Sequence, residues 1–226
     1  MKIKFQNFLK TITLKILVVA VLFVASLFLF AVIADEAVLE NENQFDQKIF
    51  GIISPYSTPN FVHVMEKITF FGSGEFLLPA YLLLASYLFI RKRFRETIDI
   101  AVVALSSTAL TFALKQYFHR ARPDLSLIKR LTTFSFPSGH TISSFILSFI
   151  LMYVISNTGL KKGIKWLLYF LLLSYTLSVG LSRIVLHVHY PTDVLAGYCF
   201  ALAWLIISFW ALQKIPFTKI ISNPVR

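Results

Sequence analysis

The sequence predicts an all-α integral membrane protein: a six-transmembrane-helix bundle with an outer interfacial helical segment, formed as a single domain over residues 1–226. Three observations lead to this prediction. The 226 residues are 57% hydrophobic and 15% charged, with a mean hydropathy of +0.72, whereas a soluble domain carries about 25% charged residues. Several apolar runs approach the roughly 20 residues that cross a bilayer. Short clusters of lysine and arginine separate these runs, as in loops that set membrane orientation.

The first span is predicted over Ile16–Ala34, a charge-free run that follows a lysine-rich start. A cleaved signal peptide is the alternative, because Val32-Ile33-Ala34 before Asp35 could be a cleavage site. The run is longer than the roughly 7–15 apolar residues of a signal-peptide core, which favours a retained helix.

Five further spans complete the predicted bundle. They are Phe76–Ile90, Ile98–Leu114, Thr141–Ile155, Trp166–Leu181 and Val194–Leu212. Residues 35–74 differ, because they begin with acidic and amide side chains. Within them, PNFVHVMEKITFFG at 59–72 has apolar residues at helical spacing, which predicts an interfacial helix against the bundle, ended by Gly72-Ser73-Gly74.

Six passes bring most basic clusters to one side of the membrane. That side holds the N-terminus, RKRFR at 91–95, KKGIK at 161–165, and Lys214, Lys219 and Arg226. By the positive-inside rule it is cytoplasmic, so both termini are predicted there. The outer side also holds bases, namely Lys115, Arg120, Arg122, Lys129, Arg130 and Arg183. Cations on the outer side do not follow the positive-inside rule, so another explanation is needed for them, such as an anion that they bind.

The net charge of +11 does not indicate a nucleic-acid partner, because no RNA- or DNA-binding motif is present and the bases form short scattered clusters. The single cysteine, Cys199, excludes an internal disulfide and a cysteine-based metal site.

Three polar clusters fall on the predicted outer rim. They are KQYFHRARP at 115–123, FPSGHT at 136–141 and SRIVLHVHYPTD at 182–193. The exit of an odd-numbered span and the entry of an even-numbered span share a face, so residues up to 78 positions apart are expected to meet. Lys115, Arg122 and Arg183 would repel one another there unless an anion lay between them, and arginine suits the multi-oxygen recognition of phosphate. Simple lipid-headgroup binding or snorkelling is the alternative for any one of them.

PSGH stands directly before an apolar helix. Pro137 and Gly139 are expected to make the turn, and Ser138 is expected to cap the helix. The free amides of a helix start favour an anion. His140 would lie on the first turn, where an imidazole beside a phosphate can protonate a leaving oxygen.

His189 and Asp193 are four residues apart near Pro191, which is expected to start the sixth span. A carboxylate can hold an imidazole in one tautomer and stabilise the cation formed when its other nitrogen attacks. His187 is secondary in this interpretation, and His63 and His119 are expected to be structural. Metal binding by His187-Val188-His189 is an alternative that lacks further ligands and is opposed by nearby cations.

Together, Lys115-x6-Arg122-Pro123, Pro137-Ser138-Gly139-His140 and Ser182-Arg183-x5-His189-x3-Asp193 resemble the three-part signature of the type-2 phosphatidic acid phosphatase superfamily. The motif core covers residues 115–193, and the short chain looks similar to the bacterial phosphatidylglycerophosphate phosphatase B type. The resemblance implies a bacterial cell-membrane lipid phosphatase, and the predicted topology puts its site at the outer face.

The resemblance also implies residue roles. His189 would be the nucleophile that forms a phosphohistidine, Asp193 would orient it, and His140 would protonate the leaving oxygen. The phosphoryl oxygens would be held by Lys115, Arg122, Ser138, Gly139 and Arg183. No metal or other cofactor is expected. Candidate substrates are phosphatidylglycerol phosphate, undecaprenyl diphosphate and phosphatidic acid, and no obligate protein partner is evident.

Two other functions remain open. Vanadium-dependent haloperoxidases share the site pattern, but they are soluble and six spans oppose that assignment. A lipid or anion transporter could use the same cations as a binding ring, although we find neither internal repeats nor broken helices in the sequence.

Overall fold

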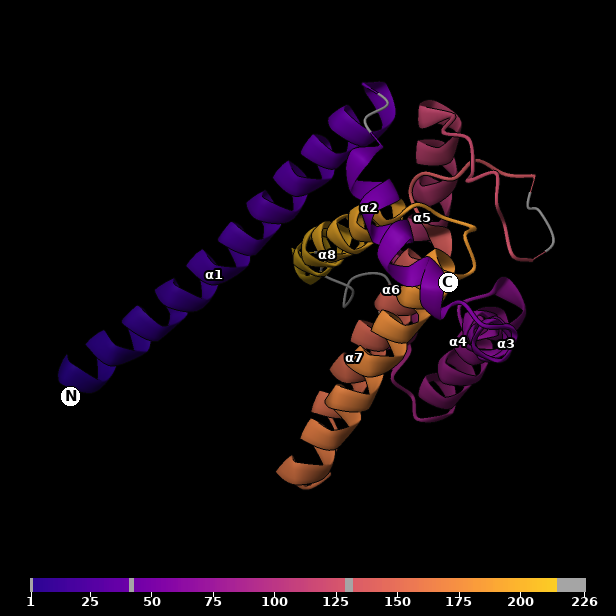
Figure 1. Cartoon of the computed structure of the whole chain (residues 1–226). Helices are drawn as coiled ribbons and strands as arrows, with labels where there is room; N and C mark the ends of the chain where they lie inside the picture. Colours follow the sequence, from indigo (N-terminus) through magenta and orange to yellow (C-terminus); the bar gives the residue numbers. More distant parts are fainter. Residues whose placement is uncertain (1, 41–42, 129–131, 215–226) are drawn as a thin grey trace, which may run out of the picture.

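The computed structural model describes residues 2–40, 43–128 and 132–214, and these residues are mostly helical (Figure 1). The helices are α1 (Lys2–Ala34), α2 (Gln44–Ile53), α3 (Pro59–Phe70), α4 (Gly74–Ile90), α5 (Phe94–Phe118), α6 (Gly139–Ser156), α7 (Lys162–Val185) and α8 (Pro191–Lys214). A π-helical turn, Asp35–Leu39, continues α1, and a 3-10 turn, Ser54–Tyr56, follows α2. Lys129, Arg130, Lys219 and Arg226, placed by the sequence in loops or termini, lie outside the described residues.

The prediction of a six-span helical membrane protein is confirmed. Among the described residues, six helical stretches are long and apolar enough to cross a membrane, and they contain the six predicted runs. The second stretch, Pro59–Ile90, combines α3 and α4, although a break at Phe71–Ser73 separates the two helices.

The predicted helix at 59–72 is present as α3, with Pro59 at its first position and Thr58 as its cap: the Thr58 hydroxyl accepts from the Phe61 amide at 3.3 Å. Figure 1 shows α3 nearly end-on while α7, against which it packs, runs across the view, so the two helices cross steeply. A steep crossing is compatible with a helix lying along the membrane surface, and that location stays a prediction. The sequence did not predict α2.

The centre of the bundle is α6, which packs against α4, α5, α7 and α8. Its buried face contributes Ile142, Ile146 and Ile150 to the main apolar core. Lipid gives helices little hydrophobic reason to associate, so small residues and polar contacts between helices gain importance. Ser144 contacts Thr176 of α7 at 3.2 Å, and Ser148 donates to the Leu172 carbonyl at 3.1 Å. By contrast, α1 packs mainly on α8, and its N-terminal half extends away from the other helices (Figure 1).

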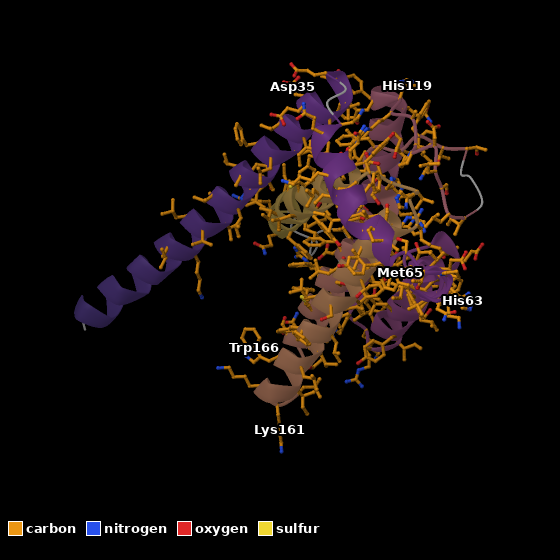
Figure 2. The ribbon with its side chains drawn as sticks, in the orientation of Figure 1. Asp35, His63, Met65, His119, Lys161 and Trp166 are labelled. Atoms are coloured by element: carbon orange, nitrogen blue, oxygen red, sulfur yellow. The ribbon has the colours of Figure 1, made fainter. Side chains whose placement is uncertain are left out.

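The polar clusters of the sequence lie at the ends of helices. Figure 2 places Asp35 and His119 at one end of the molecule and Lys161 and Trp166 at the other. The first of these ends brings together the end of α5, the start of α6, the end of α7 and the start of α8 (Figure 1). We call it the catalytic end because it holds the residues predicted to be catalytic. The three polar clusters of the sequence therefore share one end of the bundle, as their order predicted.

Candidate active site

The centre of the site is the pair His189 and Asp193. His189 lies in the short loop between α7 and α8, and Asp193 lies on the first turn of α8. Both side chains are buried, with 1% and 0% of their surface exposed. The Nδ1 of His189 is 3.2 Å from Oδ2 of Asp193, which also accepts from the Tyr190 amide at 2.9 Å and from the Ser135 hydroxyl. Three donors thus fix one carboxylate oxygen against the ring.

The partners of the ring determine its tautomer. Nη1 of Arg122 lies 3.1 Å from Nε2 of His189. A guanidinium can only donate and a carboxylate can only accept. Nε2 therefore carries the lone pair, and Nδ1 carries the hydrogen directed at Asp193. This arrangement leaves a nucleophilic nitrogen facing the cations.

Burial is the main cause that lowers the pKa of His189 well below the usual histidine value, and the positive charges of Arg183, Arg122 and Lys115 lower it further. Both effects disfavour the charged ring. The imidazole is therefore neutral at physiological pH, the form that an attacking nitrogen requires.

Lys115 and Arg122 hold the segment before α6. Nζ of Lys115 donates to the carbonyls of Phe134 and Ser135, at 2.6 and 2.9 Å. Arg122 donates through Nε to the Thr133 carbonyl at 2.7 Å and through Nη1 to the Val188 carbonyl at 2.6 Å. The two predicted phosphate ligands thus lie beside the predicted nucleophile, while several of their donors contact the protein itself.

Arg183 has free donors. Its side chain is 2% exposed, and Nη1 donates to the Thr69 hydroxyl of α3 at 2.6 Å. Within the described part of the chain, Nε and Nη2 have no acceptor. Buried donors normally find partners, so two unsatisfied guanidinium atoms next to a cationic cluster suit a multi-oxygen anion.

Ser138 precedes α6, but the predicted side-chain cap is wrong: its side chain makes no capping hydrogen bond. Its hydroxyl instead accepts from that of Thr141 at 2.9 Å, and its amide donates to the Asp193 carbonyl at 3.0 Å. The first amides of a helix have no partner within the helix. At Gly139 and His140 they are consequently left uncapped by this serine, at the positive helix end that favours an anion.

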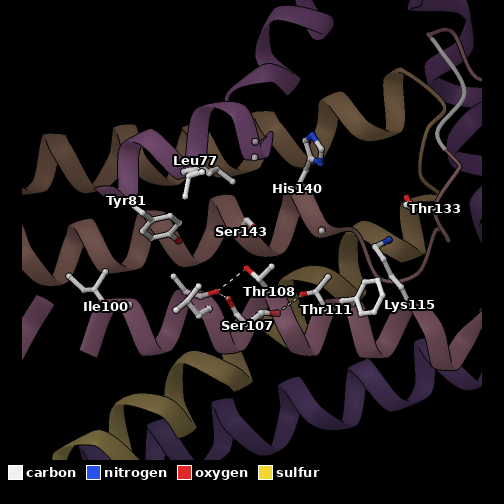
Figure 3. Close-up of a pocket in the computed structure, with 18 of the residues that line it drawn as sticks. Leu77, Tyr81, Ile100, Ser107, Thr108, Thr111, Lys115, Thr133, His140 and Ser143 are labelled. Atoms are coloured by element: carbon white, nitrogen blue, oxygen red, sulfur yellow. Dashed lines mark hydrogen bonds between the residues drawn. The ribbon is translucent and has the colours of Figure 1, made fainter. Parts of the chain in front are cut away.

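A cavity of about 660 Å³ opens from the site between α4, α5 and α6. Figure 3 shows Lys115 and Thr133 towards one end of it and Tyr81 and Ile100 towards the other, with His140 on its wall. Most of its other lining side chains are apolar or hydroxyl-bearing. A single cavity therefore joins the polar site to the apolar interior of the membrane-spanning region.

The remaining histidines have structural contacts. His187 stacks on Phe50 with ring centroids 4.5 Å apart, and its Nδ1 contacts the Val185 carbonyl. His119 ends α5 in a left-handed conformation, and His63 is an exposed partner of Glu66. Within the described residues, no three His, Cys, Asp or Glu side chains group as metal ligands.

The sequence did not predict the role of three residues around Asp193, namely Ser135, Thr192 and Asp46, and it did not predict the contacts of Arg120. Ser135 donates to the carboxylate, and Arg120 donates to its Oδ1 at 2.7 Å. The sequence contains a clue to the role of Arg120, because it is a base among apolar spans, two residues before Arg122. No feature of the sequence marks Asp46, because acidic residues are common in outer loops.

Comparison with known proteins identifies a family and relatives that are similar in sequence. The family model of the PAP2 superfamily matches residues 96–216. Phosphatidylglycerophosphatase B of Bacillus subtilis (strain 168) is 30% identical over 179 residues, which cover 78% of this chain and 88% of the relative. The bacitracin transport permease protein BcrC of Bacillus licheniformis is 37% identical over 91 residues, 40% of each chain.

Two solved structures have the same fold. The crystal structure of a transmembrane PAP2 type phosphatidylglycerolphosphate phosphatase from Bacillus subtilis matches with a TM-score of 0.75 and 26% identity, covering 86% of this chain and 98% of that one. The crystal structure of Aquifex aeolicus LpxE matches with a TM-score of 0.55 and 28% identity, covering 73% and 94%. The family model covers more than half of the sequence, and the two solved structures share its fold. The chain therefore belongs to the PAP2 superfamily and is a membrane lipid phosphatase.

Proposed function

We propose that the chain hydrolyses a phosphate monoester or diphosphate of a lipid through a phosphohistidine at His189, without a metal, at the outer face of the membrane. The observation that carries the proposal is the orientation of the buried ring. Its Nδ1 contacts Asp193 at 3.2 Å while its Nε2 faces Arg122 at 3.1 Å.

In the first step, Nε2 of His189 attacks phosphorus and the bond from phosphorus to the leaving oxygen breaks. His140 supplies the proton that this oxygen needs, because it lies on the cavity wall at the start of α6. Asp193 stabilises the positive charge that develops on the ring, as a carboxylate does in related triads. The products are the dephosphorylated lipid and a phosphohistidine.

In the second step, water attacks phosphorus, the nitrogen–phosphorus bond breaks, and His140 takes the proton from the water. Inorganic phosphate leaves and the neutral His189 returns. The two steps together consume one water and release one phosphate.

The cations take the part that metal ions have in other phosphoryl-transfer sites. Phosphoryl transfer depends mainly on positioning and on charge stabilisation. Lys115, Arg122 and Arg183 surround the ring closely enough for their charges to lower its pKa. The free donors of Arg183 and the amides of Gly139 and His140 add hydrogen bonds for the phosphoryl oxygens.

A lipid substrate is supported by the cavity that links Lys115 to apolar side chains of α4 and α5 (Figure 3). A tail can lie there while the phosphate meets the cations. The named activity of the Bacillus subtilis relative favours phosphatidylglycerol phosphate. Phosphatidic acid and undecaprenyl diphosphate are the other candidates.

The outer-face assignment depends on the opposite end of the bundle. RKRFR at 91–95 and KKGIK at 161–165 lie there, and basic loops of this kind are retained in the cytoplasm. The catalytic end would then face outwards.

The test measures phosphate release from phosphatidic acid by the purified protein with a chelator present. Wild-type activity is expected to survive chelation, and His189→Ala is expected to lose at least about 10⁴-fold in kcat. His187→Asn is the matched control, because asparagine tolerates the positive φ of 52° at this position. Equal rates for wild type and His189→Ala would refute the nucleophile assignment.

A second candidate, lipid or anion transport, is favoured only by the name of the Bacillus licheniformis relative. It predicts movement of a labelled lipid phosphate across vesicles with no phosphate release. Release by the wild type that disappears in His189→Ala would contradict it.

A further inference from the structure

Arg120 lies between two buried carboxylates. Its Nη1 donates to Oδ1 of Asp193 at 2.7 Å, and its Nη2 donates to Oδ2 of Asp46 at 2.8 Å. The arginine is 8% exposed and both acids are 0% exposed. Asp193 therefore faces His189 with one oxygen and Arg120 with the other.

Asp46 connects α2 to the first turn of α8. Its Oδ1 accepts from the Thr192 amide at 2.9 Å, and its Oδ2 accepts from the Thr192 hydroxyl at 2.7 Å. The guanidinium of Arg120 also lies over the ring of Tyr190, 4.0 Å from its centroid. Residues that are 146 and 74 positions from Asp46 in sequence thus meet at its carboxylate.

The charges of this cluster can be counted. Arg120 and Asp193 alone would sum to zero, and Asp193 would have little charge left to balance a cationic ring at His189. Asp46 adds one negative charge on the far side of Arg120, so the three groups together carry a net charge of minus one. In a buried setting such charges interact more strongly than in water.

Arg120 is also unlike the three other cations of the site. Lys115, Arg122 and Arg183 lower the pKa of His189 by their charge, whereas Arg120 forms ion pairs with Asp46 and Asp193. Two of its nitrogens are directed at carboxylates. Its geometry is that of a bridge between acids and not of a phosphate ligand.

We propose that Asp46, acting through Arg120, is a positioning residue that holds Asp193 against His189 and preserves the negative charge that balances the phosphorylated ring. The proposal rests on the proposed phosphohistidine mechanism. It gives α2 a function: this helix brings a second carboxylate to the catalytic pair without touching the reacting atoms.

The experiment compares Asp46→Asn, Arg120→Gln and the double variant in the full-length protein, with phosphatidic acid in mixed micelles as substrate. Asn retains the shape of Asp46 and one acceptor oxygen, but leaves Arg120 to neutralise Asp193. We expect kcat to fall about ten- to a hundredfold while KM stays within roughly threefold. Residues that orient a functional group through a hydrogen bond, without contacting the substrate, have effects of this size. Arg120→Gln leaves two carboxylates without the cation between them, and should lose at least as much.

The double variant separates charge from structure. It restores a net charge of minus one, so its kcat should lie within about tenfold of wild type and above the product of the two single losses. Glu66→Gln, which neutralises an exposed carboxylate of α3 paired with His63, is the matched control and should leave kcat within twofold. An unchanged kcat in Asp46→Asn, or losses that simply multiply in the double variant, would overturn the proposal.

Two further comparisons separate the role of Asp46 from a folding defect and from the proposed mechanism itself. If Asp46→Asn does not accumulate as folded protein, the double variant decides alone: a kcat above a tenth of wild type supports the proposal and a lower one overturns it. Alkaline quenching with radiolabelled substrate measures the phosphohistidine. Its absence from the wild type would refute the proposed function itself, whereas normal formation in Asp46→Asn would refute only the role of Asp46.

Discussion

The two ends of the bundle both carry lysines that donate to two backbone carbonyls, yet only one of them belongs to the site. At the catalytic end, Nζ of Lys115 contacts the carbonyls of Phe134 and Ser135 at 2.6 and 2.9 Å. At the opposite end, Nζ of Lys165 contacts those of Ser156 and Thr158 at 2.8 and 2.7 Å. Lys165 caps the carbonyl end of α6, an ordinary use of a cation.

The difference lies in what surrounds each charge. At the opposite end Arg93 pairs with Glu96 through two hydrogen bonds of 2.6 and 2.5 Å, and Arg91 and Lys161 are exposed. At the catalytic end Lys115, Arg122 and Arg183 gather around the neutral ring of His189. Identical residue types are therefore expected to form an anion site only where several of them are brought together and removed from water.

Replacing each lysine in turn tests this comparison most strongly. Lys115→Ala should lower kcat/KM by about a hundred- to a thousandfold, because one donor to the transferring phosphoryl group is lost. Lys165→Ala should change kcat/KM by less than about twofold and cost at most about 1 kcal/mol of stability as a lost helix cap. The measurement is phosphate release from phosphatidic acid, with thermal midpoints recorded for both variants. Similar losses in kcat/KM would show that the two lysines act alike.

The sequence was sufficient for the features that depend on helix order and motif. Lys115, His140, Arg183 and His189 were expected at one end because alternating spans bring their ends together, and the structure places them there. It was insufficient where a contact depends on packing. The hydroxyl of Ser138 was expected to cap α6 but instead accepts from Thr141, since the turn is held from outside by the Asp193 carbonyl.

The α2 segment shows the same limit. Its first half holds one apolar residue, Phe45, among charged and amide side chains, and the sequence did not predict a helix at 44–53. Nothing local distinguishes Asp46 from Asp35 or Glu36, although Asp46 alone of the three is fully buried. Its partner Arg120 is 74 positions away, and only the folded chain identifies the pair.

The cavity at the catalytic end allows a second test of the comparison between the two ends, with a smaller expected effect. Ala104 of α5 lines it, whereas Val102 lies outside its lining and is exposed. Ala104→Phe should displace about two methylene groups of a tail, which at ~0.8 kcal/mol each is a loss of roughly tenfold in kcat/KM. Val102→Phe should have little effect. The readout is the ratio of kcat/KM for a long-chain and a short-chain phosphatidic acid.

The tail assignment fails if both substrates lose equally in Ala104→Phe, because a general distortion of α5 would then explain the result. It also fails if Val102→Phe reduces the ratio as much as Ala104→Phe. A selective loss for the long chain would extend the comparison of the two ends, since the apolar cavity would then belong to the catalytic end as much as its cations do.

The smallest effect is expected from acid. Burial and the charges of Arg183, Arg122 and Lys115 lower the pKa of His189, and Asp193, Ser135, Arg120 and His140 also face this region. A lowered histidine pKa keeps the folded ring neutral as pH falls through about 6.5, where an unfolded chain takes up the proton. The contribution of His189 to stability is thus fully present above pH ~6.5 and is lost as pH falls towards the folded pKa, while the ring of this proposed nucleophile stays neutral.

Accordingly, kcat/KM should fall by less than about threefold between pH 7.5 and 6, with an acid limb below the usual histidine pKa of ~6.5. The substrate also titrates, since the second pKa of a phosphate ester is near 6. Two esters whose second pKa values differ separate the contributions: a limb that moves with the ester belongs to the substrate, and a fixed limb belongs to the enzyme. A fixed limb at or above pH 6.5 would mean that the cations do not act on the ring, and the contrast between the two ends would lose its electrostatic basis.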